Sequence, residues 1–191
     1  MKGLYIAALL LLVNFISNGQ DVLLWNEKFP LKWTDFLGKV NDSSQFDAEA
    51  FTSVEYSYTF YTPDKYSFKV QACFNRTTSW IKKERSCEGL LQHEQVHFSL
   101  AQLYAKKLTL AFESYKYSAN FQNEIVEIFK QIEIDYHKSQ RLFDEETNHS
   151  LISKKEKEWE AFVLEELHGA YGLTLIKSRF HGKYKLQPGA D

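Results

Sequence analysis

An α+β fold is predicted by two different hydrophobic periods along the chain. Between Ala50 and Phe74, apolar and aromatic residues alternate with polar ones, which is typical of strands with one buried face. After Cys87, apolar residues recur at three- and four-residue steps, which is typical of helices. We therefore expect an N-terminal antiparallel sheet or hairpin followed by three helices.

The first residues have the pattern of an export signal. Lys2 precedes the apolar run Leu4–Val13, which is too short to span a membrane, and a cut is expected before Gln20. The alternative is an uncleaved anchor. The remaining chain is long enough for one domain with a core, since 44% of the 191 residues are hydrophobic. The predicted organisation is a signal peptide over 1–19, one domain over 20–168 and a C-terminal extension over 169–191.

Charge excludes some classes of partner. Without residues 1–19 the chain has 22 Lys and Arg against 25 Asp and Glu, which gives a formal charge of −3. Such a mild acidic balance indicates no nucleic-acid footprint and no basic membrane face. We expect a secreted or periplasmic protein that is not inserted in the membrane after signal cleavage.

The strands are expected in three places. A short strand is predicted at Val22–Trp25, and the alternating runs Val54–Phe60 and Tyr66–Phe74 predict a hairpin with a turn at Thr62–Lys65. The turn-rich stretch Gly38–Gln45 predicts a loop.

The helices follow the hairpin. Helical spacing predicts a first helix over Cys87–Phe112 and a second over Phe121–Tyr136, with His137 at its end. The segment Arg141–Ser150 is expected to be a polar connection. A capping box at Ser153–Glu156 predicts the start of a third helix.

The two cysteines, Cys73 and Cys87, predict a disulfide, because an even pair in an exported chain usually forms one. Two free thiols or a cysteine metal ligand are the alternatives. A bridge between them would fix the start of the first helix to the sheet.

The first predicted helix contains the sequence His93-Glu94-Gln95-Val96-His97. Residues i and i+4 lie on one face of a helix, so His93 and His97 can direct both imidazoles at one point. This is the His-Glu-x-x-His pattern of zinc metallopeptidases, in which Glu94 is the candidate general base. The simpler alternative is an amphipathic helix whose polar stripe happens to contain two histidines.

A catalytic zinc ion needs a third protein ligand. His149 is preferred over His137, His168 and His181, because it follows a compact polar segment that can direct its side chain back to the first helix. Downstream carboxylates compete for this role. Asp144 is close enough in sequence to be a hydrogen-bond partner of a histidine ligand.

These motifs resemble a known family. HEQVHF at 93–98 is followed by FDEETNHS at 143–150 and by a predicted helix with Trp159, and WTDFLG at 33–38 also resembles a family element. On these residues the chain is similar to a bacterial family known as domain of unknown function 922, whose members are predicted secreted zinc-dependent proteases. The resemblance covers about 25–167. Phe143 stands where the family usually has Tyr, and Ser150 where it usually has Gly.

The resemblance and the motif together imply a zincin-like zinc peptidase acting on a peptide or protein substrate. Zn²⁺ would be held by His93, His97 and His149, with Asp144 behind them, and Glu94 would take a proton from the attacking water. Two alternatives are a non-catalytic zinc-binding or interaction protein, and a zinc amidase acting on a cell-wall or small amide substrate.

Overall fold

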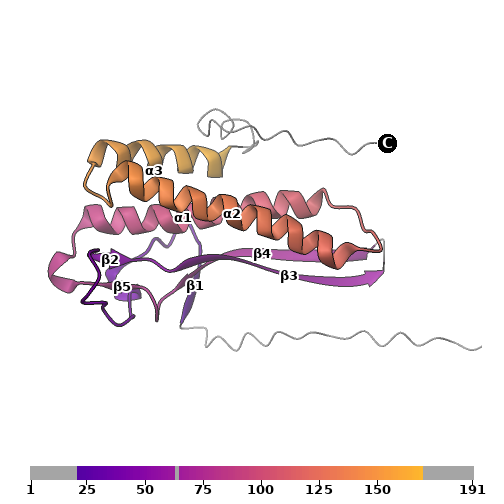
Figure 1. Cartoon of the computed structure of the whole chain (residues 1–191), viewed down its shortest axis with the longest axis horizontal. Coiled ribbons are helices and arrows are strands. Elements are labelled where there is room, and N and C mark those ends of the chain that lie inside the picture. The colour runs from indigo at the N-terminus through magenta and orange to yellow at the C-terminus, as the bar shows by residue number, and fades with distance from the viewer. Residues whose placement is uncertain (1–20, 63–64, 170–191) are drawn as a thin grey trace, which may run out of the picture.

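The computed structural model describes residues 21–62 and 65–169, and Figure 1 shows their arrangement. The predicted signal peptide and nearly all of the C-terminal extension lie outside these residues. The strands are β1 (Val22–Leu24), β2 (Ala48–Glu49), β3 (Thr52–Thr62), β4 (Lys65–Asn75) and β5 (Trp80–Ile81). The helices are α1 (Glu88–Glu113), α2 (Phe121–Thr147) and α3 (Ser153–His168), with short 3-10 turns at Trp33–Asp35 and Lys83–Arg85. The α+β fold class is confirmed.

The main sheet has the strand order β1-β4-β3, with both pairs antiparallel. Val54 lies opposite Ala72 and Tyr56 opposite Val70, as the two alternating runs predict. A separate two-stranded sheet joins β2 to β5, with Ala48 opposite Ile81. This second, small sheet was not predicted, because two-residue strands have too few positions for a period.

Helices α1 and α2 cover one face of the main sheet, and α3 lies on their far side (Figure 1). The ring of Phe112, near the end of α1, stacks on Phe68 of β4 with 4.3 Å between centroids. Tyr56 of β3 contacts both Phe112 and Phe129, so the hairpin reaches α1 and α2 together. Aromatic rings bury a large apolar area, which explains why the alternating face is so rich in them.

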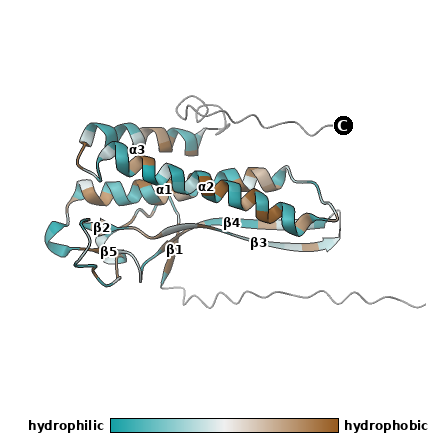
Figure 2. Cartoon of the chain, in the orientation of Figure 1, coloured by the Kyte–Doolittle hydropathy of each residue, from teal (hydrophilic) through white to brown (hydrophobic). Residues whose placement is uncertain are grey.

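A second apolar cluster joins α1 to the other two helices. It consists of Val96, Leu100, Leu103, Phe143, Trp159 and Val163. Because this cluster lies between α1, α2 and α3, it holds the three helices in place and so fixes the positions of the polar residues next to it on each helix. Figure 2 shows hydrophilic residues along all three helices, and no helix within the described residues is long and apolar enough to cross a membrane.

Helix α2 extends eleven residues beyond the predicted end at Tyr136, so the expectation that 141–150 is a polar connection is wrong. Phe143 and Thr147, four residues apart, are both fully buried, and their spacing continues the apolar face. Asp144 therefore projects from the last turn of a helix, a more rigid position than a loop.

The predicted capping box of α3 is not formed. Ile152 is the N-cap residue and Ser153 the first helical residue, with no side-chain hydrogen bond at the cap. The carboxylate of Glu156, which the capping box would direct to the backbone, instead accepts a hydrogen bond from His93 of α1.

The predicted Cys73–Cys87 disulfide is wrong, because both residues are free thiols. Ala72 and Phe74 point into the core between the sheet and the helices, so Cys73 between them points to the opposite face of β4. Cys87 is the exposed N-cap residue of α1, whereas Cys73 is buried in β4.

The turn between α2 and α3 has three consecutive residues in the left-handed region. Their φ angles are 48° for Asn148, 50° for His149 and 72° for Ser150. Glycine adopts such angles without steric cost, whereas a residue with a Cβ atom is strained there. A glycine at position 150, as in the pattern that the chain resembles, would adopt this backbone conformation without strain, whereas Ser150 adopts it with strain.

We predict that Ser150→Gly raises the free energy of unfolding by about 1 kcal/mol, because it removes this left-handed strain. Denaturant unfolding of the wild type and variant measures the change. Ser86→Gly is the matched control, since Ser86 is exposed with φ −63° and gains nothing from glycine. Equal effects of the two substitutions would contradict the prediction.

Candidate metal centre

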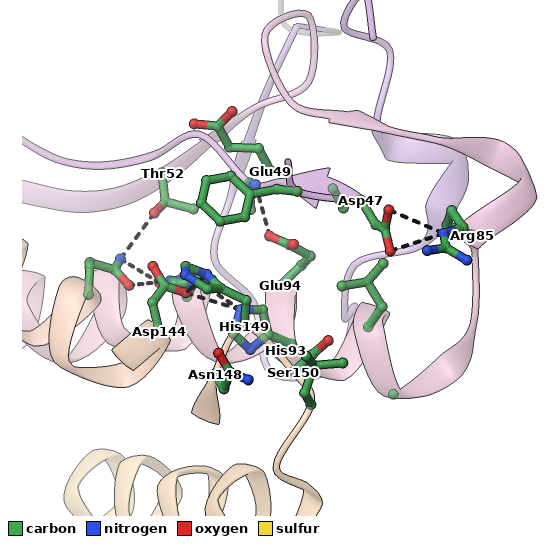
Figure 3. Close-up of a pocket in the computed structure, with 18 of the residues that line it drawn as sticks. Asp47, Glu49, Thr52, Arg85, His93, Glu94, Asp144, Asn148, His149 and Ser150 are labelled. Atoms are coloured by element: carbon green, nitrogen blue, oxygen red, sulfur yellow. Dashed lines mark hydrogen bonds and ion pairs between the residues drawn. The ribbon is translucent and has the colours of Figure 1, made fainter. Parts of the chain in front are cut away.

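The first turns of α1 form the floor of a cavity of about 930 Å³. His93 and Glu94 are each only 3% exposed and line this cavity together with His97. One wall is the segment 45–52, which includes β2, and the opposite wall is the end of α2 with the left-handed turn (Figure 3). The core packing of α1 on both sides therefore places three polar side chains at the bottom of an accessible cavity.

Three ligand-type atoms converge at this point. The Nε2 atoms of His93 and His97 are 3.2 Å apart, and the Oδ1 atom of Asp144 lies 3.2 Å from the first and 3.0 Å from the second. A zinc ion about 2.1 Å from each of three tetrahedral ligands places those ligands about 3.4 Å from one another. The three observed separations are close to this value. His93, His97 and Asp144 could thus hold a metal ion.

Hydrogen bonds on the far side of each ring determine which nitrogen faces this point. The Nδ1 atom of His93 lies 2.9 Å from Oε1 of Glu156, and that of His97 lies 2.6 Å from Oε1 of Gln140. Gln140 also donates from Nε2 to the backbone oxygen of His97, which fixes the orientation of its amide. Both partners accept, so both histidines carry a proton on Nδ1. Their Nε2 lone pairs would then face each other, an arrangement that needs a proton or a cation between them.

The electrostatics of the cluster agree with a site for positive charge. Burial by itself lowers the pKa of His93, but its hydrogen bonds to Asp144 and Glu156 outweigh burial and raise that pKa to about 9. Burial by itself raises the pKa of Asp144, but His93 and His97 hold it well below its usual range. Without a metal ion, a proton on His93 supplies the positive charge; a bound cation would displace it.

The Glu94 carboxylate lies next to the three converging atoms but is not one of them. Its Oε2 atom accepts a hydrogen bond of 2.8 Å from the backbone N–H of Ala50, in the cavity wall (Figure 3). Burial raises the pKa of Glu94, although the neighbouring histidines act in the opposite direction. A carboxylate with a raised pKa beside a metal-bound water is suited to accept a proton.

His149 lies at the edge of the cluster. Its Nδ1 atom is 3.4 Å from Oδ1 of Asp144, its ring contacts Phe46 at 4.4 Å between centroids, and 45% of its side chain is exposed. Asp144, which the sequence predicts as an outer partner, occupies the inner position instead. The role of His149 as third ligand stays a prediction.

Phe143 packs against the back of the site. Its ring stacks on His93 at 4.5 Å and meets His97 edge-on at 4.9 Å, and it is fully buried. Phenylalanine at this position therefore packs against both imidazoles, and the three ligand-type atoms converge without a tyrosine hydroxyl there.

Two residues of the site were missed in the sequence. Gln140 lies within α2, and its spacing of 43 residues from His97 has no recognisable pattern. The spacing Ser153-x-x-Glu156 predicts a helix cap and so gives Glu156 a different role. Only the packing of three helices shows that both residues hold the imidazoles of α1.

A sheet covered by helices, with His-Glu-x-x-His on the first helix and Asp144 facing it from the second, defines a domain with a possible metal site. The chain belongs to the family described as bacterial protein of unknown function (DUF922), whose sequence model matches residues 42–150. This range begins before β2 and ends at Ser150, so it includes His93, His97 and Asp144. No curated protein and no solved structure matches the chain.

We predict that His93→Ala, His97→Ala and Asp144→Ala each reduce zinc affinity by at least about 100-fold, since each removes one of three ligand atoms. Equilibrium dialysis against a chelator measures it. His137→Ala is the control, because His137 lines the same cavity without joining the cluster. His149→Ala decides between the two candidates for third ligand. A loss of zinc affinity equal to that of His93→Ala would make His149 a ligand, and a much smaller loss would leave Asp144 in that role.

The pKa of His93 predicts a pH dependence of the metal-free protein. The pKa of His93 is about 9 in the folded protein and about 6.5 in the unfolded chain. Protonated His93 therefore stabilises the fold fully below pH 6.5, and this stabilisation is lost as the pH rises through about 9. Lys107, whose pKa burial lowers to about 8, titrates with the opposite effect. Denaturant unfolding with chelator at pH 6 and pH 9.5 should therefore show a larger loss for wild type than for His93→Gln. Equal pH dependence would contradict the prediction.

Proposed function

We propose that this protein is a zinc-dependent hydrolase of peptide bonds. The observation that carries the proposal is the close triangle of His93, His97 and Asp144 atoms with the Glu94 carboxylate buried beside it. A zinc ion held there would supply a bound water with a pKa near 7 and would stabilise negative charge on a carbonyl oxygen.

The residues of the chain have separate tasks in this reaction. Glu94 accepts the proton of the attacking water and passes it to the leaving amine. The N–H of Ala50 holds one Glu94 oxygen and so fixes the direction of the other. Gln140 and Glu156 orient the two imidazoles through Nδ1. Phe143 excludes water from behind them.

The shape of the cavity favours a peptide substrate over a small amide. One wall is the continuous segment 45–52, in which β2 pairs with β5 in a sheet of two strands. An extended peptide can add to a strand that has an unpaired edge. A non-catalytic zinc-binding protein is the second candidate, because the same cluster could hold an ion for stability alone. An exported location remains a prediction from residues 1–19.

We predict that Glu94→Gln reduces peptide hydrolysis roughly 10²–10⁴-fold while zinc binding and the fold change little, because the amide keeps the size of the side chain and cannot take a proton. The assay exposes a mixed library of unstructured peptides to zinc-loaded protein and identifies new termini by mass spectrometry. Chelator should abolish cleavage, and added zinc should restore it.

The outcomes separate the candidates. Equal cleavage by wild type and Glu94→Gln would show that Glu94 is not the base. Tight zinc binding without cleavage of any peptide would favour the non-catalytic protein. Glu88→Gln is the matched control, since Glu88 is exposed at the start of the same helix.

A further inference from the structure

Helix α3 contributes a carboxylate to the candidate metal centre from outside the residues that the family model matches. Glu156 lies six residues beyond Ser150, where the match ends. Its Oε1 atom is 2.9 Å from Nδ1 of His93, and only 15% of its side chain is exposed. We propose that Glu156 is a positioning residue, which holds His93 in the tautomer and orientation that a metal ion at the cluster requires.

The tautomer matters because a neutral imidazole has one N–H and one lone pair. A carboxylate can only accept, so Glu156 holds a proton on Nδ1 of His93 and leaves Nε2, which lies 3.2 Å from Asp144, as the nitrogen that can bind a metal ion. Stacking on Phe143 holds the plane of the ring, but it does not distinguish one nitrogen from the other. The hydrogen bond to Glu156 makes that distinction.

The two imidazoles have different partners. His97 donates to the neutral amide of Gln140, whereas His93 donates to the charged carboxylate of Glu156. A carboxylate partner increases the basicity of a ligating histidine more than an amide does. Glu156 therefore strengthens one ligand selectively, and it adds a negative charge next to a buried centre built for a cation.

A simpler role for Glu156 is to stabilise the start of α3. It lies in the first turn, where an acidic side chain interacts favourably with the helix dipole. This role needs the charge and does not need the hydrogen bond to His93. Glu156→Gln separates the two roles, because the amide oxygen can still accept from Nδ1 while the charge is gone.

The inference rests on the metal-binding half of the proposed function and not on peptide cleavage. The experiment measures zinc affinity by chelator competition and, in zinc-loaded protein, the exchange of the His93 Nδ1 proton with water by ¹H–¹⁵N correlation of ¹⁵N-labelled histidine. We expect Glu156→Ala to weaken zinc binding about 10–100-fold and to speed the exchange of this proton, because it loses its hydrogen-bond acceptor. Glu156→Gln should keep the Nδ1 proton protected and lose less than about tenfold in affinity.

Glu160→Ala is the matched control, because Glu160 is exposed one turn further along α3 and should leave both measurements unchanged. Wild-type zinc affinity in Glu156→Ala, or equal losses in Glu156→Ala and Glu156→Gln, would overturn the proposal, as would a wild type that binds no zinc. Zinc bound as expected with no peptide cleaved would reject the peptidase and leave the role of Glu156 standing.

Discussion

The structure depends on keeping the Nε2 atoms of His93 and His97 3.2 Å apart. Histidines at this distance repel unless a proton or cation lies between them, so the surroundings must supply negative charge and firm hydrogen bonds. Asp144 supplies the charge in front, and Gln140 and Glu156 accept hydrogen bonds behind. Each of these three side chains comes from a helix packed against α1.

Burial strengthens the electrostatic interactions of this cluster and raises the cost of leaving any of its charges unpaired. A buried charge needs a partner, and electrostatic interactions are larger where water is excluded. The apolar cluster around Phe143 and Trp159 fills the space behind the imidazoles. Glu94 is 3% exposed and is bound by the N–H of Ala50, and burial raises its pKa, which suits a proton acceptor. Stability and the proposed chemistry thus use the same contacts.

Local patterns in the sequence predicted the elements well. The alternation through Tyr56 and Phe68 defined the hairpin, and the spacing of Leu100, Leu103 and Leu108 defined α1. The pairing of His93 with His97 followed from helix geometry alone. Each of these features depends on residues close together in the chain.

The predictions that are wrong concern residues that lie far apart in the sequence and meet only in the folded chain. The end of α2 was missed because Asp144, Glu145 and Glu146 look like a surface loop, whereas buried Phe143 and Thr147 continue the helix. The predicted Cys73–Cys87 disulfide is wrong because an even pair of cysteines does not show that the two side chains meet: Cys73 is buried in β4 and Cys87 is exposed at the start of α1. The inner position of Asp144 and the contact from Glu156 depend on how α2 and α3 pack on α1, which no local period encodes.

The position of the cluster at the junction of three helices bears on how the chain folds. His93 precedes Asp144 by 51 residues and Glu156 by 63, so the histidine pair is synthesised well before its partners. Contacts between distant residues form only after the loop between them closes. An ion at the cluster would cross-link α1 directly to α2 and, through Glu156, hold α3, so its binding free energy would count as folding free energy. Cys73 and Cys87 are free thiols, so a bound ion would provide the kind of cross-link between distant parts of the chain that a disulfide provides in other domains.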